Sequence, residues 1–200
     1  MSKTILLFHG WGGNKPEAWQ EQLFTAFSAQ GIDVRYPKMP EPGNPEPGAW
    51  IAAQEAALAE ITDPSSVTIL THSLGAITYL HVASRATKQL ADRVLLVAPP
   101  YVVPGVPPWS APPSVDRFFA PPLDGEAVKR AARETLIVGG NDDDYATWEQ
   151  IETYAKKLDI PCHCLNGAGH LSPYWGYGKW PWVEAWALGE AEWPPQPKPV

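Results

Sequence analysis

The segment Thr71-His72-Ser73-Leu74-Gly75 carries the sharpest chemical signal in the sequence. It stands where the apolar stretch 67–70 gives way to a stretch of helical periodicity at 76–83. A tight strand-to-helix turn strains its central residue, raises that side chain above the sheet edge and requires small neighbours. Gly75 meets this requirement, although Thr71 stands where glycine is usual. The pattern predicts that Ser73 is a nucleophile.

A serine hydroxyl needs an imidazole to take its proton and a carboxylate to orient that imidazole. Of the five histidines, only His170 lies in a glycine-containing loop after the last expected strand. The acid would come from the run Asp142-Asp143-Asp144, which follows the apolar stretch 136–138. One carboxylate of this run must face inward while its neighbours are solvated or cap the next helix. We choose Asp143, with Asp142 as the alternative, and the order serine, aspartate, histidine is typical of one hydrolase architecture.

A glycine-rich turn near the start of the chain could stabilise negative charge. The apolar stretch 6–8 runs directly into His9-Gly10-Trp11-Gly12-Gly13. Small residues there would let backbone amides point at a developing oxyanion, and we name the amides of Trp11 and Leu74 as the donors. A phosphate-binding loop is the competing interpretation, but the Gly-x-Gly-x-x-Gly spacing and a following Lys-Ser/Thr pair are missing.

Several loop aromatics are candidates for the substrate pocket. Trp109 and Trp175 lie in expected loops, and His9 opens the glycine-rich turn, so we assign these three to the pocket wall. Tryptophan also fills cores, which is the simpler interpretation for those on helical stretches. Cys162 and Cys164 are one residue apart in an expected strand and point to opposite faces, which argues against a disulfide or a metal site. We expect no metal and no organic cofactor.

Short apolar runs alternate with stretches of helical periodicity, a pattern typical of the α/β class. The expected strands are 4–8, 33–36, 67–71, 93–98, 135–139 and 161–165, and the expected helices are 16–30, 49–61, 74–87, 147–158 and 182–188. We therefore predict a mostly parallel sheet of about six strands with helices on both faces. The proline-rich stretch 99–122 would form a minimal cover over the site. We expect one domain over 1–190 and a proline-rich tail over 191–200, of which residues 193–200 should be extended and poorly packed.

Composition excludes some classes of partner. The 200 residues include 15 basic and 22 acidic side chains, a net charge of −7, with no basic cluster of the kind that binds nucleic acid. The start of the sequence has an apolar run too short for a signal segment or a membrane span, so we expect a cytoplasmic protein with no membrane partner. Oligomeric state stays open between a monomer and a weak dimer.

These motifs resemble the small serine hydrolases of the α/β-hydrolase superfamily, in the family of retinoblastoma-binding protein nine and the bacterial YdeN-like proteins. The resemblance spans nearly the whole chain and rests on His9-Gly10, Met39-Pro40-Glu41-Pro42 with Trp50, His72-Ser73-Leu74-Gly75, Leu95-Leu96-Val97-Ala98-Pro99-Pro100, Ala168-Gly169-His170 and Trp180-Pro181. In that family the acid is the second of two aspartates before a proline, which implies Asp143 here, with Asp144 in place of the proline.

The resemblance implies a single-domain α/β-hydrolase fold. The expected function is cleavage of a small carboxylic ester, or a related acyl compound, through an acyl-enzyme on Ser73. Two alternatives stay open. One is a protein-binding module that retains the three residues, and the other is an acyltransferase, which would use the same residues and differ in excluding water.

Overall fold

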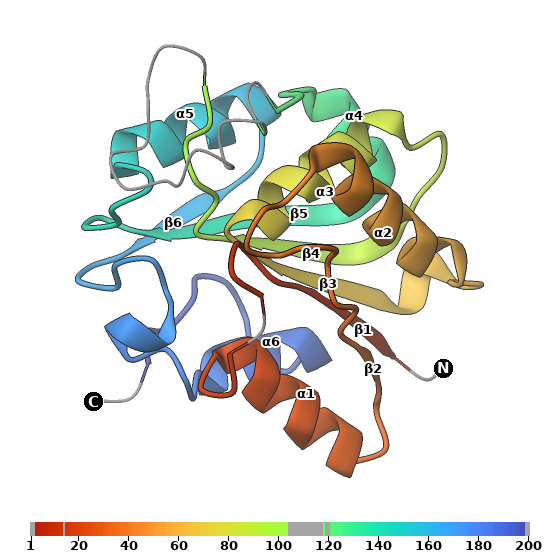
Figure 1. Cartoon of the computed structure of the whole chain (residues 1–200), viewed down its shortest axis with the longest axis horizontal. Helices are drawn as coiled ribbons and strands as arrows, with labels where there is room; N and C mark the ends of the chain where they lie inside the picture. Colours follow the sequence, from red (N-terminus) through yellow and green to blue (C-terminus); the bar gives the residue numbers. More distant parts are fainter. Residues whose placement is uncertain (1–2, 14, 104–117, 119–120, 199–200) are drawn as a thin grey trace.

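The computed structural model describes residues 3–13, 15–103, 118 and 121–198. Within these residues, six strands form one sheet of order β2-β1-β3-β4-β5-β6, in which every pairing is parallel (Figure 1). The strands are β1 (Thr4–Phe8), β2 (Asp33–Arg35), β3 (Val67–His72), β4 (Ala91–Val97), β5 (Ala132–Gly140) and β6 (Cys162–Leu165). The helices are α1 (Trp19–Ala29), α2 (Pro47–Ala59), α3 (Leu74–Arg85), α4 (Gly125–Ala131), α5 (Trp148–Leu158) and α6 (Pro181–Leu188), with short 3-10 turns at Pro64–Ser66 and Pro173–Trp175.

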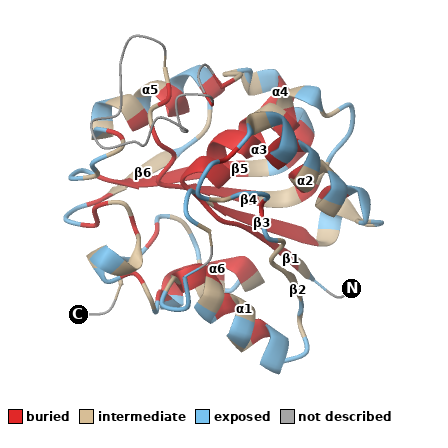
Figure 2. Ribbon diagram, in the orientation of Figure 1, coloured by how far each residue is buried: buried red, intermediate tan, exposed pale blue. Residues whose placement is uncertain are grey.

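Two hydrophobic cores lie on opposite faces of the sheet. Alternate residues of β1 point to opposite sides, so that Leu6 and Phe8 enter one core and Ile5 and Leu7 the other. Helices α2, α3, α4 and α5 cover the first face, and α1 and α6 cover the second (Figure 1). Burial on both faces explains why the central strands are nearly continuous apolar runs, and these strands are buried along most of their length (Figure 2). The predicted parallel sheet of six strands with helices on both faces is confirmed.

The parallel arrangement decides where a site can form. The carboxyl ends of β1, β3, β5 and β6 lie along one edge of the sheet, and the loops that follow them meet there. The loops after β1, β5 and β6 are residues 9–13, 141–145 and 166–170, and the turn after β3 is residue 73. Every catalytic residue proposed from the sequence lies in one of them or directly after one.

One helix was not predicted. Helix α4 is only seven residues long, and the Asp124 side chain caps it by accepting a hydrogen bond from the amide of Ala127. It ends where β5 begins, so no loop separates the two elements. The expected cover at 99–122 falls mostly outside the described residues. Within the described part of the chain, no helix is long and apolar enough to cross a membrane.

The expectation of a poorly packed tail is wrong for its described part, residues 193–198. The indole N–H groups of Trp180 and Trp182 donate to the carbonyls of Gln196 and Glu192 at 2.7 and 3.0 Å. The Trp193 ring packs edge-on against Trp182, within the aromatic cluster beside α6. An extended proline-rich backbone forms no internal hydrogen bonds, so its carbonyls are free to accept from buried indoles.

Candidate active site

Ser73 occupies the turn between β3 and α3 with φ 53° and ψ −125°, a conformation that is costly for a residue with a side chain. Its amide donates to the carbonyl of Val97 at 2.9 Å. A Cβ atom on Gly75 would lie 2.6 Å from the carbonyl oxygen of Phe8, and one on Gly10 would lie 2.6 Å from the Ser73 Cβ. The two glycines therefore let the turn pack directly against the end of β1.

Thr71 fits this turn despite its bulk. Its φ is not in the left-handed region, and its hydroxyl donates to the carbonyl of Leu95 at 3.1 Å inside the sheet. Because the strain of the turn is carried by Ser73 alone, the position of Thr71 does not require glycine.

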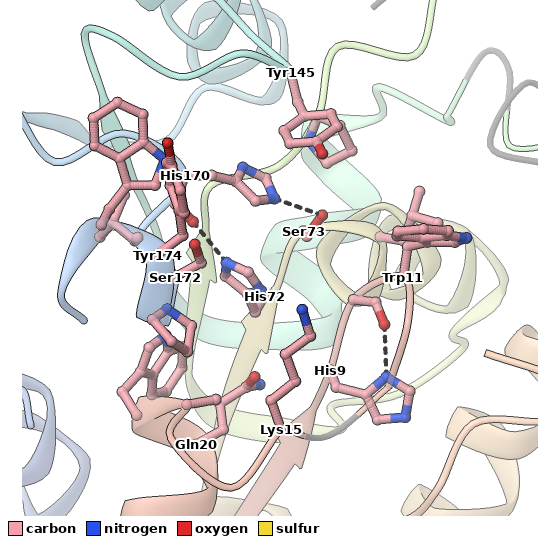
Figure 3. A pocket seen from close by; sticks show the side chains of 18 of the residues that line it. His9, Trp11, Lys15, Gln20, His72, Ser73, Tyr145, His170, Ser172 and Tyr174 are labelled. Carbon is pink, nitrogen blue, oxygen red and sulfur yellow. Dashed lines mark hydrogen bonds between the residues drawn. The ribbon is translucent and has the colours of Figure 1, made fainter. Parts of the chain in front are cut away.

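His170 lies between Ser73 and Asp143. Its Nε2 atom is 2.9 Å from the Ser73 hydroxyl, and its Nδ1 atom is 2.8 Å from Oδ2 of Asp143 (Figure 3 shows the first contact). An ionised carboxylate can only accept, so Nδ1 carries the proton and Nε2 is free to accept from the hydroxyl. The Asp143 side chain is 2% exposed, and its second oxygen accepts from the amide of Tyr145 at 2.9 Å. This geometry suits a serine nucleophile with an imidazole base.

The three neighbouring aspartates have different surroundings. Asp143 contacts the imidazole, whereas Oδ1 of Asp142 accepts from the backbone amide of Gly169 at 2.8 Å and so holds the loop that carries His170. Asp144 contributes to the wall of the pocket beside Tyr145. Of the two candidates considered from the sequence, the structure brings Asp143 to the histidine.

The two residues whose amides were chosen as oxyanion donors, Trp11 and Leu74, both line the pocket at Ser73. Leu74 is the first residue of α3, so helix geometry leaves its amide without an intrahelical acceptor at the positive end of the helix dipole. In the glycine-rich turn, the amides of Gly12 and Gly13 donate to the carbonyls of Pro42 and Gly10. Among the described residues no acceptor is found for the amide of Trp11.

A pocket of about 290 Å³ opens at Ser73. Its wall includes the apolar or aromatic residues Trp11, Trp19, Leu74, Pro100, Tyr145, Leu171, Pro173, Tyr174 and Trp175, and the polar residues His9, Lys15, Gln20, His72, Asp144, His170 and Ser172. Of the predicted pocket residues, His9 and Trp175 contribute to this wall. Trp109 lies outside the described residues.

The imidazole of His9 is committed to the framework of the site. Its Nδ1–H donates to the carbonyl of Gly10 at 2.7 Å, and its Nε2 accepts from the amide of Met39 at 3.0 Å. The ring packs edge-on against Trp50, and Figure 3 shows it turned away from Ser73. Burial lowers its pKa. His9 therefore ties the glycine-rich turn to the segment before α2.

His72 is the residue that the sequence-based assignment missed most clearly. Its Nε2–H donates to the backbone carbonyl of His170 at 2.8 Å, and the two imidazole centroids are 4.9 Å apart. Burial lowers the pKa of His72 to about 3, and the neighbouring His170 adds to this effect, so His72 is neutral at physiological pH. Its position next to Ser73 was the available signal. The consequence is that a neutral ring supports the backbone of His170.

The comparisons with known proteins agree with this geometry. A family model described as serine hydrolase matches residues 5–187. The chain is 20% identical over 185 residues to the hydrolase YdeN of Bacillus subtilis (strain 168), covering 92% of this chain and 93% of that protein. The crystal structure of the B. subtilis ydeN gene product matches with a TM-score of 0.77 at 16% identity, over 94% of this chain and 98% of that one.

A pyrethroid hydrolase from Sphingobium faniae matches with a TM-score of 0.63 at 16% identity, over 95% of this chain and 97% of that one. At these identities, the likeness to the solved structures concerns the fold, while the family model covers nearly the whole sequence. The chain belongs to the serine hydrolase family and is a small α/β-hydrolase of the YdeN-like kind.

Proposed function

We propose that this hydrolase cleaves a small carboxylic ester through an acyl-enzyme on Ser73. The observation that carries the proposal is the pair of hydrogen bonds at His170, 2.9 Å to the Ser73 hydroxyl and 2.8 Å to Asp143. A surface histidine would not hold a strained serine and a buried carboxylate at the same time. The fold relative that is named as a pyrethroid hydrolase supports a small organic substrate.

In the first half-reaction the Ser73 oxygen attacks the ester carbonyl carbon while its proton passes to Nε2 of His170. The amides of Trp11 and Leu74 donate to the oxyanion of the tetrahedral intermediate. His170 then gives the proton to the leaving alkoxy oxygen, and the carbon–oxygen bond breaks to release the alcohol. Asp143 stays ionised and stabilises the imidazolium that forms between these steps.

In the second half-reaction water replaces the alcohol. His170 accepts a proton from the water as it attacks the acyl carbon, and returns that proton to the Ser73 oxygen as the acid leaves. The products are one alcohol and one carboxylic acid, and the enzyme is restored. No cofactor takes part in this scheme.

Turnover of 4-nitrophenyl acetate and butyrate tests the proposal. We expect Ser73→Ala to abolish turnover above the uncatalysed rate, and a fluorophosphonate to label the wild type but not this variant. Ser84→Ala is a matched control. Ser84 lies on α3, the helix that follows Ser73, and its hydroxyl donates to the carbonyl of His81. Equal rates for wild type and Ser73→Ala, with no labelling of Ser73, would refute the proposal and favour the protein-binding alternative.

A further inference from the structure

The wall of the pocket at Ser73 includes a positively charged side chain, Lys15, that the hydrolytic mechanism does not use. Lys15 lies just after the glycine-rich turn and contributes to the pocket wall. Figure 3 shows its side chain directed into the space beside His72 and below Ser73. Among the residues that the structure describes, none forms an ion pair with Lys15. An unpaired ammonium that points into a pocket is a candidate for binding a negatively charged ligand.

Among the described residues, Lys15 is the only lysine or arginine that lines this pocket. Burial keeps His72 neutral, and it also lowers the pKa of His9. In the proposed mechanism, His170 takes up the proton of Ser73. The ammonium of Lys15 therefore offers a bound substrate a positive charge that does not depend on proton transfer from Ser73.

A hydroxyl lies in the same wall. Ser172 begins the 3-10 turn Pro173–Trp175, yet its side chain forms no capping hydrogen bond with that turn. Figure 3 places Ser172 beside His72, and both residues line the pocket together with Lys15. The wall thus contains two donors, one charged and one neutral, and a carboxylate has two oxygens that can accept hydrogen bonds.

The rest of the wall sets limits on such a contact. Lys15 and Trp11 are exposed, so water reaches this part of the pocket and a charged hydrogen bond there has the strength expected at a partly solvated site. Asp144 also contributes to the wall, beside Tyr145. A negative group would be repelled near Asp144 and attracted near Lys15, so the pocket orients a substrate that carries one negative end.

We propose that the substrate of this hydrolase is a monoester of a short dicarboxylic acid, whose free carboxylate is bound by Lys15 and Ser172 while Ser73 attacks the ester carbonyl. The inference rests on the proposed ester hydrolysis and specifies its substrate class. The acyl side is assigned because Lys15 follows the turn that carries Trp11, whose amide faces the carbonyl oxygen in the proposed mechanism. One ammonium and one hydroxyl match a carboxylate better than a phosphate, which carries more charge and more acceptors.

The test compares two esters that differ in charge alone. Monoethyl glutarate ends in a carboxylate, and ethyl 4-carbamoylbutanoate has a neutral amide of the same shape. Release of ethanol gives kcat/KM for each, and the ratio of the two values is the readout. We expect the wild type to prefer the anionic ester by about three- to tenfold, the range for a charged hydrogen bond at a partly solvated site.

Lys15→Gln and Ser172→Ala should each lower this ratio, and Lys15→Arg should retain most of it because the charge is kept. Lys157→Gln is the matched control, because it removes one positive charge from the end of α5, outside the pocket wall. Its ratio should equal that of the wild type. Salt should reduce the preference of the wild type and leave the ratio of Lys15→Gln nearly constant.

A ratio near one in the wild type, or an equal ratio in wild type and Lys15→Gln, would overturn the proposal. A preference limited to esters with a carboxylate in the alcohol, tested with 4-acetoxybenzoate against phenyl acetate, would also overturn it. These failures are distinct from failure of ester hydrolysis itself. Hydrolysis of the neutral ester that Ser73→Ala abolishes would leave the proposed function standing while the carboxylate assignment falls.

Discussion

Replacement of Asp143 by asparagine should reduce kcat far more than the same change at Asp142. Asp143 uses both oxygens, one toward Nδ1 of His170 at 2.8 Å and the other toward the amide of Tyr145 at 2.9 Å. Asparagine has only one acceptor oxygen, so one of the two donors would face an NH₂ group. The side chain is 2% exposed, so water could not replace the lost partner.

The magnitude follows from the charge that His170 acquires during the reaction. A carboxylate and an imidazolium about 4 Å apart attract by about 4 kcal/mol at an effective dielectric constant of about 20. Loss of that interaction in the transition state corresponds to a fall in kcat of about a thousandfold. Asp142→Asn keeps an oxygen that can accept from the amide of Gly169, and we expect its kcat to stay within about threefold of the wild type.

The assay is steady-state hydrolysis of 4-nitrophenyl butyrate by wild type, Asp142→Asn and Asp143→Asn, with thermal unfolding of each to confirm that all three are folded. The reasoning would be refuted if the folded Asp143→Asn variant kept more than about a tenth of the wild-type kcat. A thousandfold loss in Asp142→Asn alone would assign the acid to that residue instead.

Three further predictions concern stability. The pKa of His72 is about 3 in the folded protein and 6.5 in a free imidazole, so the unfolded chain binds the proton first as pH falls. The free energy of unfolding should therefore drop between pH 6.5 and 3 by at most about 1.4 kcal/mol per pH unit. Urea unfolding across this range should therefore show a shallower pH dependence for His72→Gln, and equal slopes would contradict the burial argument. Gly75→Ala should lower the free energy of unfolding, measured with denaturant, by about 1 to 3 kcal/mol, because the new methyl group would press on the carbonyl of Phe8. A neutral effect would mean that the turn can move away from β1. Removal of residues 191–200 should lower the free energy of unfolding by about 2 to 4 kcal/mol, because Trp182 loses a carbonyl acceptor and the packing of the Trp193 ring. An unchanged melting temperature would show that these contacts contribute nothing.

Local patterns determined much of the fold. The strands were predictable because apolar runs at the centre of a parallel sheet are buried on both faces, and each expected strand overlaps an observed one. Five helices were predictable from their periodicity. Helix α4 was not, because seven residues provide fewer than two full turns of periodic signal. The tail was misjudged because composition does not reveal that Trp180 and Trp182 supply donors for its carbonyls.

The sequence by itself also indicated Ser73 and His170, since the turn after β3 and the glycine-rich loop after β6 are local features. The tertiary structure decided which partners they meet. Ser73 and His170 are 97 residues apart, and their 2.9 Å contact depends on the order of the strands in the sheet and the direction of each side chain at its edge. The same geometry selects Asp143 over Asp142, because neighbouring residues in a turn point in different directions, and a pattern of residue types does not carry that direction.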